Sequence, residues 1–215
     1  MKIWIVFLSL FLFIGCSQKE QMPPPFKILE IAGRDHAPNS SKPLIYRVKV
    51  PNDWIVQIPS AQNSLSDTTK ALAEFFIIDG NQSIRIAIHN FPSDKMTQRI
   101  PPIAQLNRWK KQFQSVDPVS FRILPQAFAG YSGFRIEAKG LLGNVKSALL
   151  GWALQLSSEH YQALSHSNSP LLALKYRQMR ADVTIKATGE ESLMDQHKQD
   201  IIAFARSFQL IDDIP

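Results

Sequence analysis

Cys16 is the only cysteine in the 215 residues, and it directly follows an apolar N-terminal run. Lys2 precedes apolar residues from Ile3 to Ile14, with one serine among them, and Gly15 then supplies a small residue. A charged start, a short apolar stretch and a small residue before the cut are typical of a secretory signal peptide. The run is too short to span a membrane, which takes about 20 apolar residues. The sequence therefore predicts an export signal over residues 1–15.

The segment Phe13-Ile14-Gly15-Cys16 resembles a bacterial lipobox, with Phe13 where that family usually has Leu. In the family, signal peptidase II cuts before the cysteine, which becomes diacylated on sulfur and acylated on its new amino group. The resemblance implies a lipid anchor on Cys16, and two or three acyl chains hold a protein at a membrane stably. Ser17 replaces the Asp that commonly marks inner-membrane retention, which favours the periplasmic side of the outer membrane and leaves the inner membrane possible. The alternative is an ordinary secretory signal followed by an unrelated cysteine.

An acylated Cys16 leaves no thiol for a disulfide, a thiolate metal site or a cysteine nucleophile. The segment Gly130-Tyr131-Ser132-Gly133 approaches a nucleophile elbow, but Gly-x-Ser-x-Gly needs a glycine where Phe134 stands. A serine hydrolase would also need a histidine and a carboxylate to activate Ser132. The five histidines are scattered along the chain. A hydrolase is therefore the least favoured hypothesis, and we interpret the segment as a turn.

Metal ligands are not suggested by the histidine spacing. His160 and His166 lie six positions apart beside Glu159, whereas two ligands on one helix face need a step of three or four. An exposed loop is the favoured interpretation. His89 and His197 fall in apolar patterns of a strand and a helix, where hydrogen-bonded packing is the more common role. We therefore expect no metal site, no cofactor and no catalytic residue.

Composition limits the class of protein. After removal of the signal about 200 residues remain, which suits one domain with a sizeable core. Hydrophobic residues at 45% and charged residues at 20% are ordinary globular values, and they exclude a wholly disordered or a transmembrane protein. The formal net charge of +6 is a mild excess. For an exported chain, the acidic partners would be lipid headgroups or cell-wall polymers rather than nucleic acid.

Proline and serine divide the mature chain into a tether and a domain. Residues 23–25 are all proline and residues 38–41 are Pro-Asn-Ser-Ser, which predicts a tether over 16–43. The intervening Phe26 to Ile31 is apolar enough to pair as a short edge strand. One domain is expected over 44–211, and it begins with a strand whose alternating apolar residues are Leu44, Tyr46, Val48 and Val50.

A hairpin is the clearest local signal. Residues 71–78 and 83–91 flank Asp79-Gly80, a dipeptide that tolerates the positive φ angles of a tight turn. On the second strand Ile84, Ile86 and Ile88 share one face. Trp54, before a further extended piece, is expected to anchor the core.

Pro101-Pro102 predicts the start of a helix. Its buried stripe would comprise Ile103, Leu106, Trp109 and Phe113. Strands are expected at 120–128, 131–138, 145–156 and 176–187. Thr188 and Glu191 fit a capping box, which predicts a helix running to about Phe208. Its buried face would comprise Leu193, His197, Ile201, Phe204, Ala205 and Phe208.

Strands, a helix, further strands and a final helix predict an α+β domain, a mainly antiparallel sheet with helices packed on it. The segments Pro51 to Trp54, Leu106 to Gln112 and Phe204 to Phe208 resemble the PsbP-like fold, an α-β-α sandwich. The resemblance covers roughly 44–210, with an insertion around 157–170. It extends to small exported lipoproteins of chlamydiae and planctomycetes that share an Asn-Arg-Trp-x-x-Gln helix. Members of the fold mostly bind or support other components, so the resemblance implies a protein that is not an enzyme.

The candidate surface or pocket comprises Arg108, Trp109, Lys111 and Trp152. Tryptophans can line a ligand cleft, although packing is their more common role. The cations could meet lipid headgroups or an acidic partner. Two main hypotheses follow. The first is a membrane-anchored, non-catalytic lipoprotein that serves envelope assembly or maintenance through protein contacts. The second is a lipoprotein that binds a small apolar or anionic ligand, or a lipid, between sheet and helix.

Overall fold

The computed structural model describes residues 26–34, 43–58, 68–93, 95–157 and 170–212. The predicted export signal, Cys16, His160 and His166 lie outside these residues. So does most of the insertion expected around 157–170. Within the described part of the chain, none of the helices combines the length and apolarity that a membrane crossing requires.

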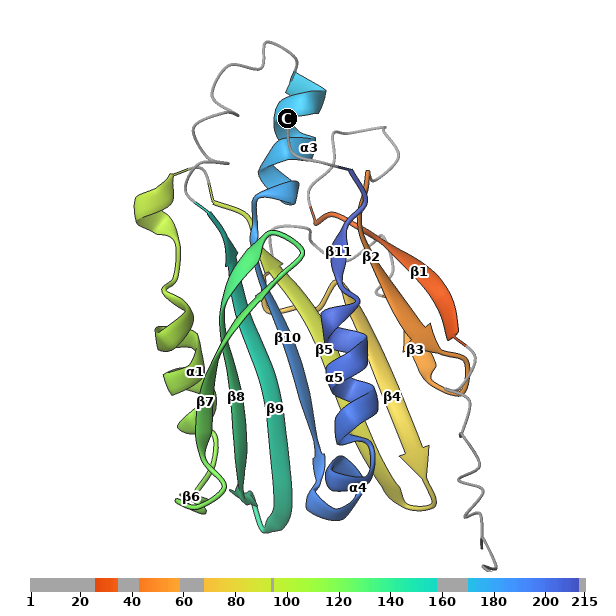
Figure 1. Cartoon of the computed structure of the whole chain (residues 1–215), viewed down its shortest axis with the longest axis vertical. Helices are drawn as coiled ribbons and strands as arrows, with labels where there is room; N and C mark the ends of the chain where they lie inside the picture. The colour runs from red at the N-terminus through yellow and green to blue at the C-terminus, as the bar shows by residue number, and fades with distance from the viewer. Residues whose placement is uncertain (1–25, 35–42, 59–67, 94, 158–169, 213–215) are drawn as a thin grey trace, which may run out of the picture.

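The architecture is an α+β domain around antiparallel sheets, which confirms the expected fold class (Figure 1). The larger sheet has eight strands, with seven in the order β3-β4-β5-β10-β9-β8-β6 and β7 paired to β8. Their bounds are β3 Ile55–Gln57, β4 Ala73–Asp79, β5 Gln82–Phe91, β6 Ser115–Val116, β7 Arg122–Phe128, β8 Tyr131–Leu142, β9 Val145–Leu156 and β10 Asp182–Glu190. A three-stranded sheet has the order β1-β2-β11, with bounds Phe26–Ala32, Leu44–Pro51 and Gln209–Leu210.

Helices lie on both faces of the larger sheet. The helix α1 (Pro102–Lys110) packs on β8 and β9, while α4 (Glu191–Gln196) contacts β9 and β10. The helix α5 (Lys198–Arg206) packs against β2, and α3 (Pro170–Met179) precedes β10. A single 3-10 turn, η1, spans Met96–Gln98. Figure 1 shows α1 at one side of the molecule and β1 at the other.

The hairpin predicted from alternating apolar and polar residues is present as β4 and β5. The hairpin of β4 and β5 turns at Asp79-Gly80, where Gly80 has φ 56°. The isoleucines of β5 are fully buried, as expected for one face of a half-buried strand, and Trp54 anchors the same core. Of the stripe predicted on α1, Leu106, Trp109 and Phe113 are buried. The prediction for Ile103 is wrong, because 43% of this residue is exposed.

The strand β9 divides the apolar residues between two cores. Leu150, Trp152 and Leu154 belong to the large core shared with α5, whereas Leu149 and Ala153 join α1 in a smaller core. Successive side chains of a strand point to opposite faces, so this alternation is obligatory. Gly151 lies under α1, where an added Cβ would come within 2.5 Å of Cζ3 of Trp109. The helix therefore approaches the sheet at a position without a side chain.

The predicted start of the domain at residue 44 is too late. The segment Phe26–Ala32, placed within the tether, forms β1 and pairs with β2 along its length, with Leu29 opposite Val48. Ile31 is buried in the large core, and Leu29 packs against it. The segment that the sequence analysis considered as a possible edge strand is thus part of the domain. Its short apolar pattern could not identify its partner strand.

The strand predicted at 176–187 begins later, because Tyr176 to Met179 end α3. Met179 ends the helix and is buried in the large core. The sequence pattern placed it instead on the buried face of the strand that follows. The capping box is also wrong. Thr188 lies in β10, opposite Leu149 and Arg85, and no side chain caps α4. The final helix is divided at His197 into α4 and α5.

An ion pair joins the segment after η1 to the end of β9 and the start of β10. The guanidinium of Arg99 donates to Asp182 Oδ1 at 2.6 and 2.9 Å and to the carbonyl oxygen of Leu156 at 3.0 Å. The amide of Gln155 donates to the other carboxylate oxygen at 2.9 Å. Both charged side chains are nearly buried. Burial raises the pKa of Asp182 above its ordinary value, while the bond from Arg99 opposes this rise.

We predict that Gly151→Ala lowers the free energy of unfolding by about 1–3 kcal/mol, the usual cost of overpacking a core. The new methyl group would meet the buried ring of Trp109, which cannot move without displacing α1. Urea unfolding of the variant checks this. In a Trp109→Leu background the same change should cost clearly less, and an equal cost in both backgrounds would contradict the assigned contact.

We expect Arg99→Met to destabilise the fold by roughly 3–5 kcal/mol at pH 7, because it leaves a buried carboxylate without its cation. Arg99 lowers the pKa of Asp182, so in the variant this buried carboxyl should take up a proton at a higher pH than in the unmodified protein. The deficit should therefore shrink as the pH falls, because a neutral carboxyl no longer needs the cation. Urea unfolding at pH 7 and pH 5 measures both effects. A double variant with Asp182→Asn should lose less than Arg99→Met alone, and a deficit independent of pH would refute this account.

Candidate functional site

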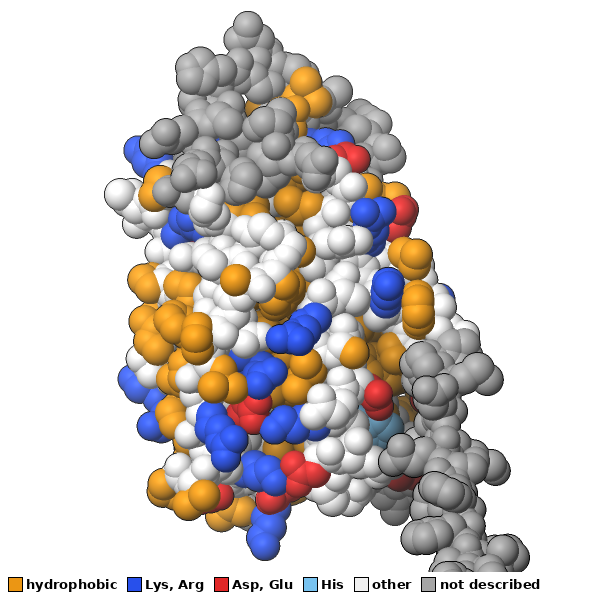
Figure 2. Space-filling model, in the orientation of Figure 1, with side chains coloured by type: hydrophobic (Ala, Val, Ile, Leu, Met, Phe, Trp, Pro, Cys, Tyr) orange, Lys and Arg blue, Asp and Glu red, His pale blue; other side chains and the backbone are white. Residues whose placement is uncertain are grey.

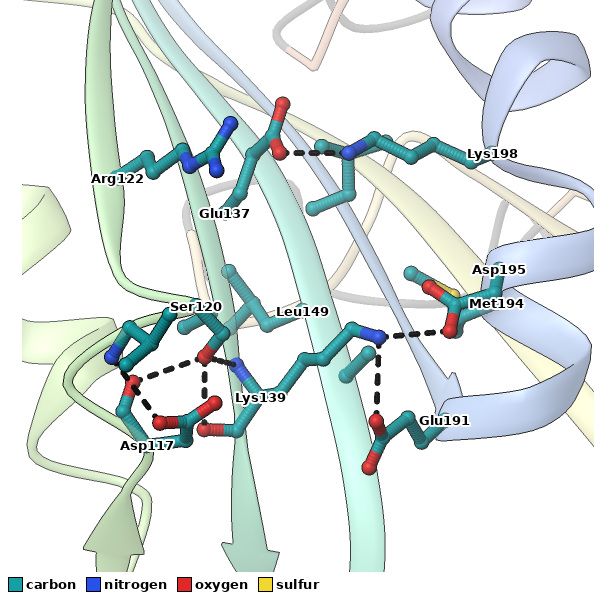
Figure 3. Close-up of a pocket in the computed structure, with 14 residues that line it drawn as sticks. Asp117, Ser120, Arg122, Glu137, Lys139, Leu149, Glu191, Met194, Asp195 and Lys198 are labelled. Carbon is teal, nitrogen blue, oxygen red and sulfur yellow. Dashed lines mark hydrogen bonds and ion pairs between the residues drawn. The ribbon is translucent and has the colours of Figure 1, made fainter.

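A hollow of about 370 Å³ opens between α4, α5 and the outer strands β7 and β8 (Figure 3). We call it the charged hollow. Its ionisable and hydroxyl residues are Asp117, Ser120, Arg122, Glu137, Lys139, Glu191, Asp195 and Lys198. Apolar lining comes from residues that include Leu149, Leu150 and Met194. Figure 2 shows blue and red side chains gathered together on the lower part of this face.

The secondary structure explains why these charges meet. Glu137 and Lys139 are two apart on β8, so they share the face that looks toward α4 and α5. Glu191 and Asp195 are four apart on α4, so they lie on one side of that helix. Lys198 opens α5. Each element contributes its polar side to the hollow and its apolar side to a core.

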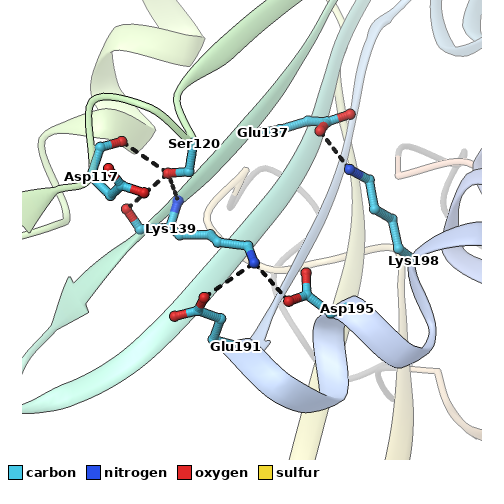
Figure 4. A network of polar contacts seen from close by, with 7 residues as sticks. All are labelled: Asp117, Ser120, Glu137, Lys139, Glu191, Asp195 and Lys198. Carbon is cyan, nitrogen blue, oxygen red and sulfur yellow. Dashed lines mark hydrogen bonds and ion pairs between the residues drawn. The ribbon is translucent and has the colours of Figure 1, made fainter.

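Lys139 bridges the sheet and α4 at one end of the hollow (Figure 4). Its Nζ donates to Asp195 Oδ2 at 2.6 Å and to Glu191 Oε1 at 3.1 Å. The bond to Asp195 is the main cause that raises the pKa of Lys139 above its ordinary 10.5. Its backbone N–H donates to Ser120 Oγ at 3.0 Å, and this hydroxyl donates to the carbonyl oxygen of Asp117 at 2.9 Å. The loop before β7 is thereby fixed to β8.

Glu137 occupies the other end and is surrounded by cations. One carboxylate oxygen accepts from Lys198 Nζ at 2.7 Å, and the other lies 2.7 Å from Arg135 Nη2. Arg122 is opposite Glu137 in the register of β7 and β8, and Figure 3 shows its guanidinium beside that carboxylate. Three cations thus surround one carboxylate here, while two carboxylates surround Lys139. The hollow is cationic at one end and anionic at the other.

The sheet separates Ser132 from the imidazole of His89. His89 lies on β5, separated from β8 by β10 and β9, and three strand spacings amount to about 14 Å. The His89 ring lies 3.3 Å from the carbonyl oxygen of Thr69, and burial lowers its pKa. His197 lies 3.4 Å from the carboxylate of Asp200. Over the described ranges, no group of three or more acidic, histidine or cysteine residues is arranged to hold a metal ion.

The two tryptophans of the candidate pocket do not meet. Trp109 packs over Gly151 in the smaller core, and Trp152 lies in the large core on the other face of β9. The cleft that both were expected to line is therefore filled by packing. Arg108 is exposed on α1, and Lys111 is exposed directly after it. Arg108 lies near Lys186, whose Nζ donates to Gln112 at 2.5 Å and whose pKa burial lowers to about 8.

Sequence reasoning missed the charged hollow. The ion pairs between β8 and the helices join residues 52, 56 and 61 positions apart, so no local spacing reveals them. A signal existed in β8, where Glu137 and Lys139 alternate with the buried Ile136 and Ala138. Two opposite charges on one strand face indicate a polar surface, but they do not say which helix covers it.

We predict that Lys139→Met lowers the free energy of unfolding by less than about 1 kcal/mol, since the pairs are partly exposed and screened by water. The charged Lys139 stabilises the fold at pH values below its ordinary pKa of 10.5. This stabilisation is lost as the pH rises through the raised pKa. The difference from the unmodified protein should therefore vanish in strong alkali. It should also shrink in 1 M salt, with Lys146→Met as an exposed control. A loss insensitive to salt and to alkali would contradict an electrostatic role.

No protein-family model matches the chain, and no curated protein matches it. Among solved structures, it is similar to cyanobacterial PsbP (CyanoP) from Synechocystis sp. PCC 6803, with 15% identity and a TM-score of 0.44. That match covers 77% of this chain and 86% of the other. It is also similar to LpqN, involved in cell envelope biogenesis of Mycobacterium tuberculosis, with 11% identity, a TM-score of 0.49 and coverages of 85% and 91%. Both are distant likenesses of fold, and they carry no conclusion about function.

Proposed function

We propose that the protein is a lipid-anchored, non-catalytic binding module of the cell envelope that holds a protein partner in the charged hollow. The anchor is supported by the lipobox resemblance at Phe13-Ile14-Gly15-Cys16, and the periplasmic side of the outer membrane is favoured by Ser17. The partner would be an envelope protein, and the role would be assembly or maintenance of the envelope. Nucleic acid is not among the expected partners.

The observation that carries the proposal is the arrangement of charge in the hollow. Glu137 sits among Arg122, Arg135 and Lys198, while Lys139 lies between two carboxylates. The side chains of Glu191 and Asp195 remain 39% and 53% exposed, so an incoming group can reach them. A surface with one cationic and one anionic end complements a segment that carries both charges in the opposite order. A protein loop offers such a pattern, and a small apolar ligand does not.

The same geometry argues against the two other hypotheses. Glu137, Glu191 and Asp195 are engaged by ammonium or guanidinium groups, which suits recognition more than proton transfer. The Ser132 hydroxyl and the His89 ring lie far apart across the sheet. The cleft considered for a small ligand is occupied by Trp109 and Gly151, in van der Waals packing. We therefore favour a protein partner over a ligand or lipid, and propose that the protein is not an enzyme.

Photo-crosslinking in the native cells tests the proposal. A photoreactive residue would replace Val119, which lines the hollow and is 83% exposed, in the full-length chain. The matched control places it at Ile78 on β4, which is 58% exposed. We expect one dominant envelope protein to crosslink through position 119 and to be lost with Cys16→Ser, since anchoring places the two together.

A charge-reversal variant identifies the hollow itself as the binding surface. Lys198→Glu should reduce the crosslink from position 119 several-fold, because it reverses a charge at the cationic end and leaves Glu137 without the ammonium group that it contacts. Thermal unfolding of the purified variant would verify that it still folds. Equal crosslinks from positions 119 and 78 would sink the proposal. Failure to capture a protein, with a lipid or small molecule co-purifying, would promote the ligand-binding hypothesis instead.

A further inference from the structure

The first strand turns large apolar side chains outward. Phe26 and Ile28 are 50% and 64% exposed, while Ile31 of the same strand is buried. In the antiparallel register Ile28 lies opposite Lys49 and Phe26 opposite Pro51, so these side chains share the outer face. Exposed apolar residues are common singly on protein surfaces. Two on one face at the start of the domain form a small patch.

A groove extends this patch toward α5. It has a volume of about 440 Å³ and is lined by Phe26, Lys49 and Pro51 on one side. On the other side it is lined by α5 and the residue after it, with one carboxylate beside the cation: Asp200, Ala203, Phe204, Arg206 and Ser207. The Nζ of Lys49 lies 4.9 Å from the centroid of the Phe26 ring. Figure 2 shows orange and blue side chains next to one another at the right margin, where Figure 1 places β1.

The patch lies near the expected anchor. Ten residue steps separate Cys16 from Phe26. A fully extended chain advances at most about 3.3–3.6 Å per residue, so the acylated cysteine would lie within roughly 35 Å of β1. That distance is about the diameter of a small domain. Such a tether would keep the start of β1 within about one domain diameter of the bilayer, so the side of the molecule that carries β1 could reach the lipid surface.

We propose that the face formed by Phe26, Ile28, Lys49 and Arg206, which we call the β1 face, rests on the membrane surface. The proposal depends on the lipid anchor of the proposed function. Phe26 and Ile28 would insert at the boundary between headgroups and acyl chains, as apolar side chains of interfacial segments do. Lys49 and Arg206 would meet anionic headgroups. Stable anchoring commonly combines acyl chains with such a second contact.

The β1 face and the charged hollow lie on opposite flanks of α5. Lys198 of this helix lines the hollow, whereas Asp200 and Ala203 line the groove beside the β1 face. At about 100° per residue, these two lie roughly 200° and 140° around the helix from Lys198. A domain resting on the β1 face would therefore keep the hollow clear of the lipid. The same orientation would present the hollow to a partner in the periplasmic space.

Fluorescence quenching from the bilayer tests the contact. The full lipidated chain would carry Ile28→Cys, labelled with a polarity-sensitive fluorophore, in vesicles of phosphatidylethanolamine and phosphatidylglycerol. Acylated Cys16 would not react with the label. The control is Ile103→Cys on α1, which is 43% exposed. We expect quenching by nitroxide-labelled lipid to be several-fold stronger at position 28, and weaker there once Lys49→Glu and Arg206→Glu are introduced.

Each outcome separates this inference from the proposed function. A chain that does not float with the vesicles would refute the lipid anchor. A chain that floats, with equal quenching at positions 28 and 103, would overturn the membrane contact alone. Label self-quenching at position 28 that grows with the protein-to-lipid ratio would assign the β1 face to a second copy of the chain. That result would also overturn the contact with lipid.

Discussion

Both faces of β9 are covered, and this constraint determines the rest of the architecture. Trp152 fills the large core, and Gly151 leaves room for Trp109 on the other face. The helix α1 is thereby assigned to one side of the sheet, and α4 and α5 to the other. The register of β8 against β9 then decides which β8 side chains face α4. Because Lys139 is opposite Ala148 and Glu137 opposite Leu150, the charges of β8 meet the acidic and basic residues of the helices.

The elements predicted well are those whose signal is local. The hairpin at Asp79-Gly80 and the strand β2 follow from alternation and turn chemistry within a few residues. Met179 was misassigned because a buried residue at a helix end continues the period of the next strand. Thr188 fits a helix cap in isolation, but pairing to strands on both sides outweighs one side-chain hydrogen bond. The hollow could not be predicted because its ion pairs depend on contacts between distant elements.

In the proposed binding role, the charges of the hollow would recognise a partner at modest energetic cost. Its ions are paired within the protein, so the free state leaves few of them without compensation. A partner with complementary charges would exchange existing pairs for new ones, which favours specificity and orientation over high affinity. Lys186 presents the contrasting case on the opposite face. Its neighbours Arg85 and Arg108 are cations, and its ammonium group is partly withdrawn from water.

The small sheet joins the beginning of the described chain to its end, and this has a consequence for folding. The backbone N–H of Lys49 donates to Ser207 Oγ, 158 positions away, and the ring of Tyr46 stacks on Phe208. Contacts of such long sequence separation slow folding, since the chain must close a large loop before they form. In a chain exported from its N-terminus, β1 and β2 would lack these partners until α5 had crossed the membrane. If the proposed export signal acts, the core could close only after α5 had been translocated.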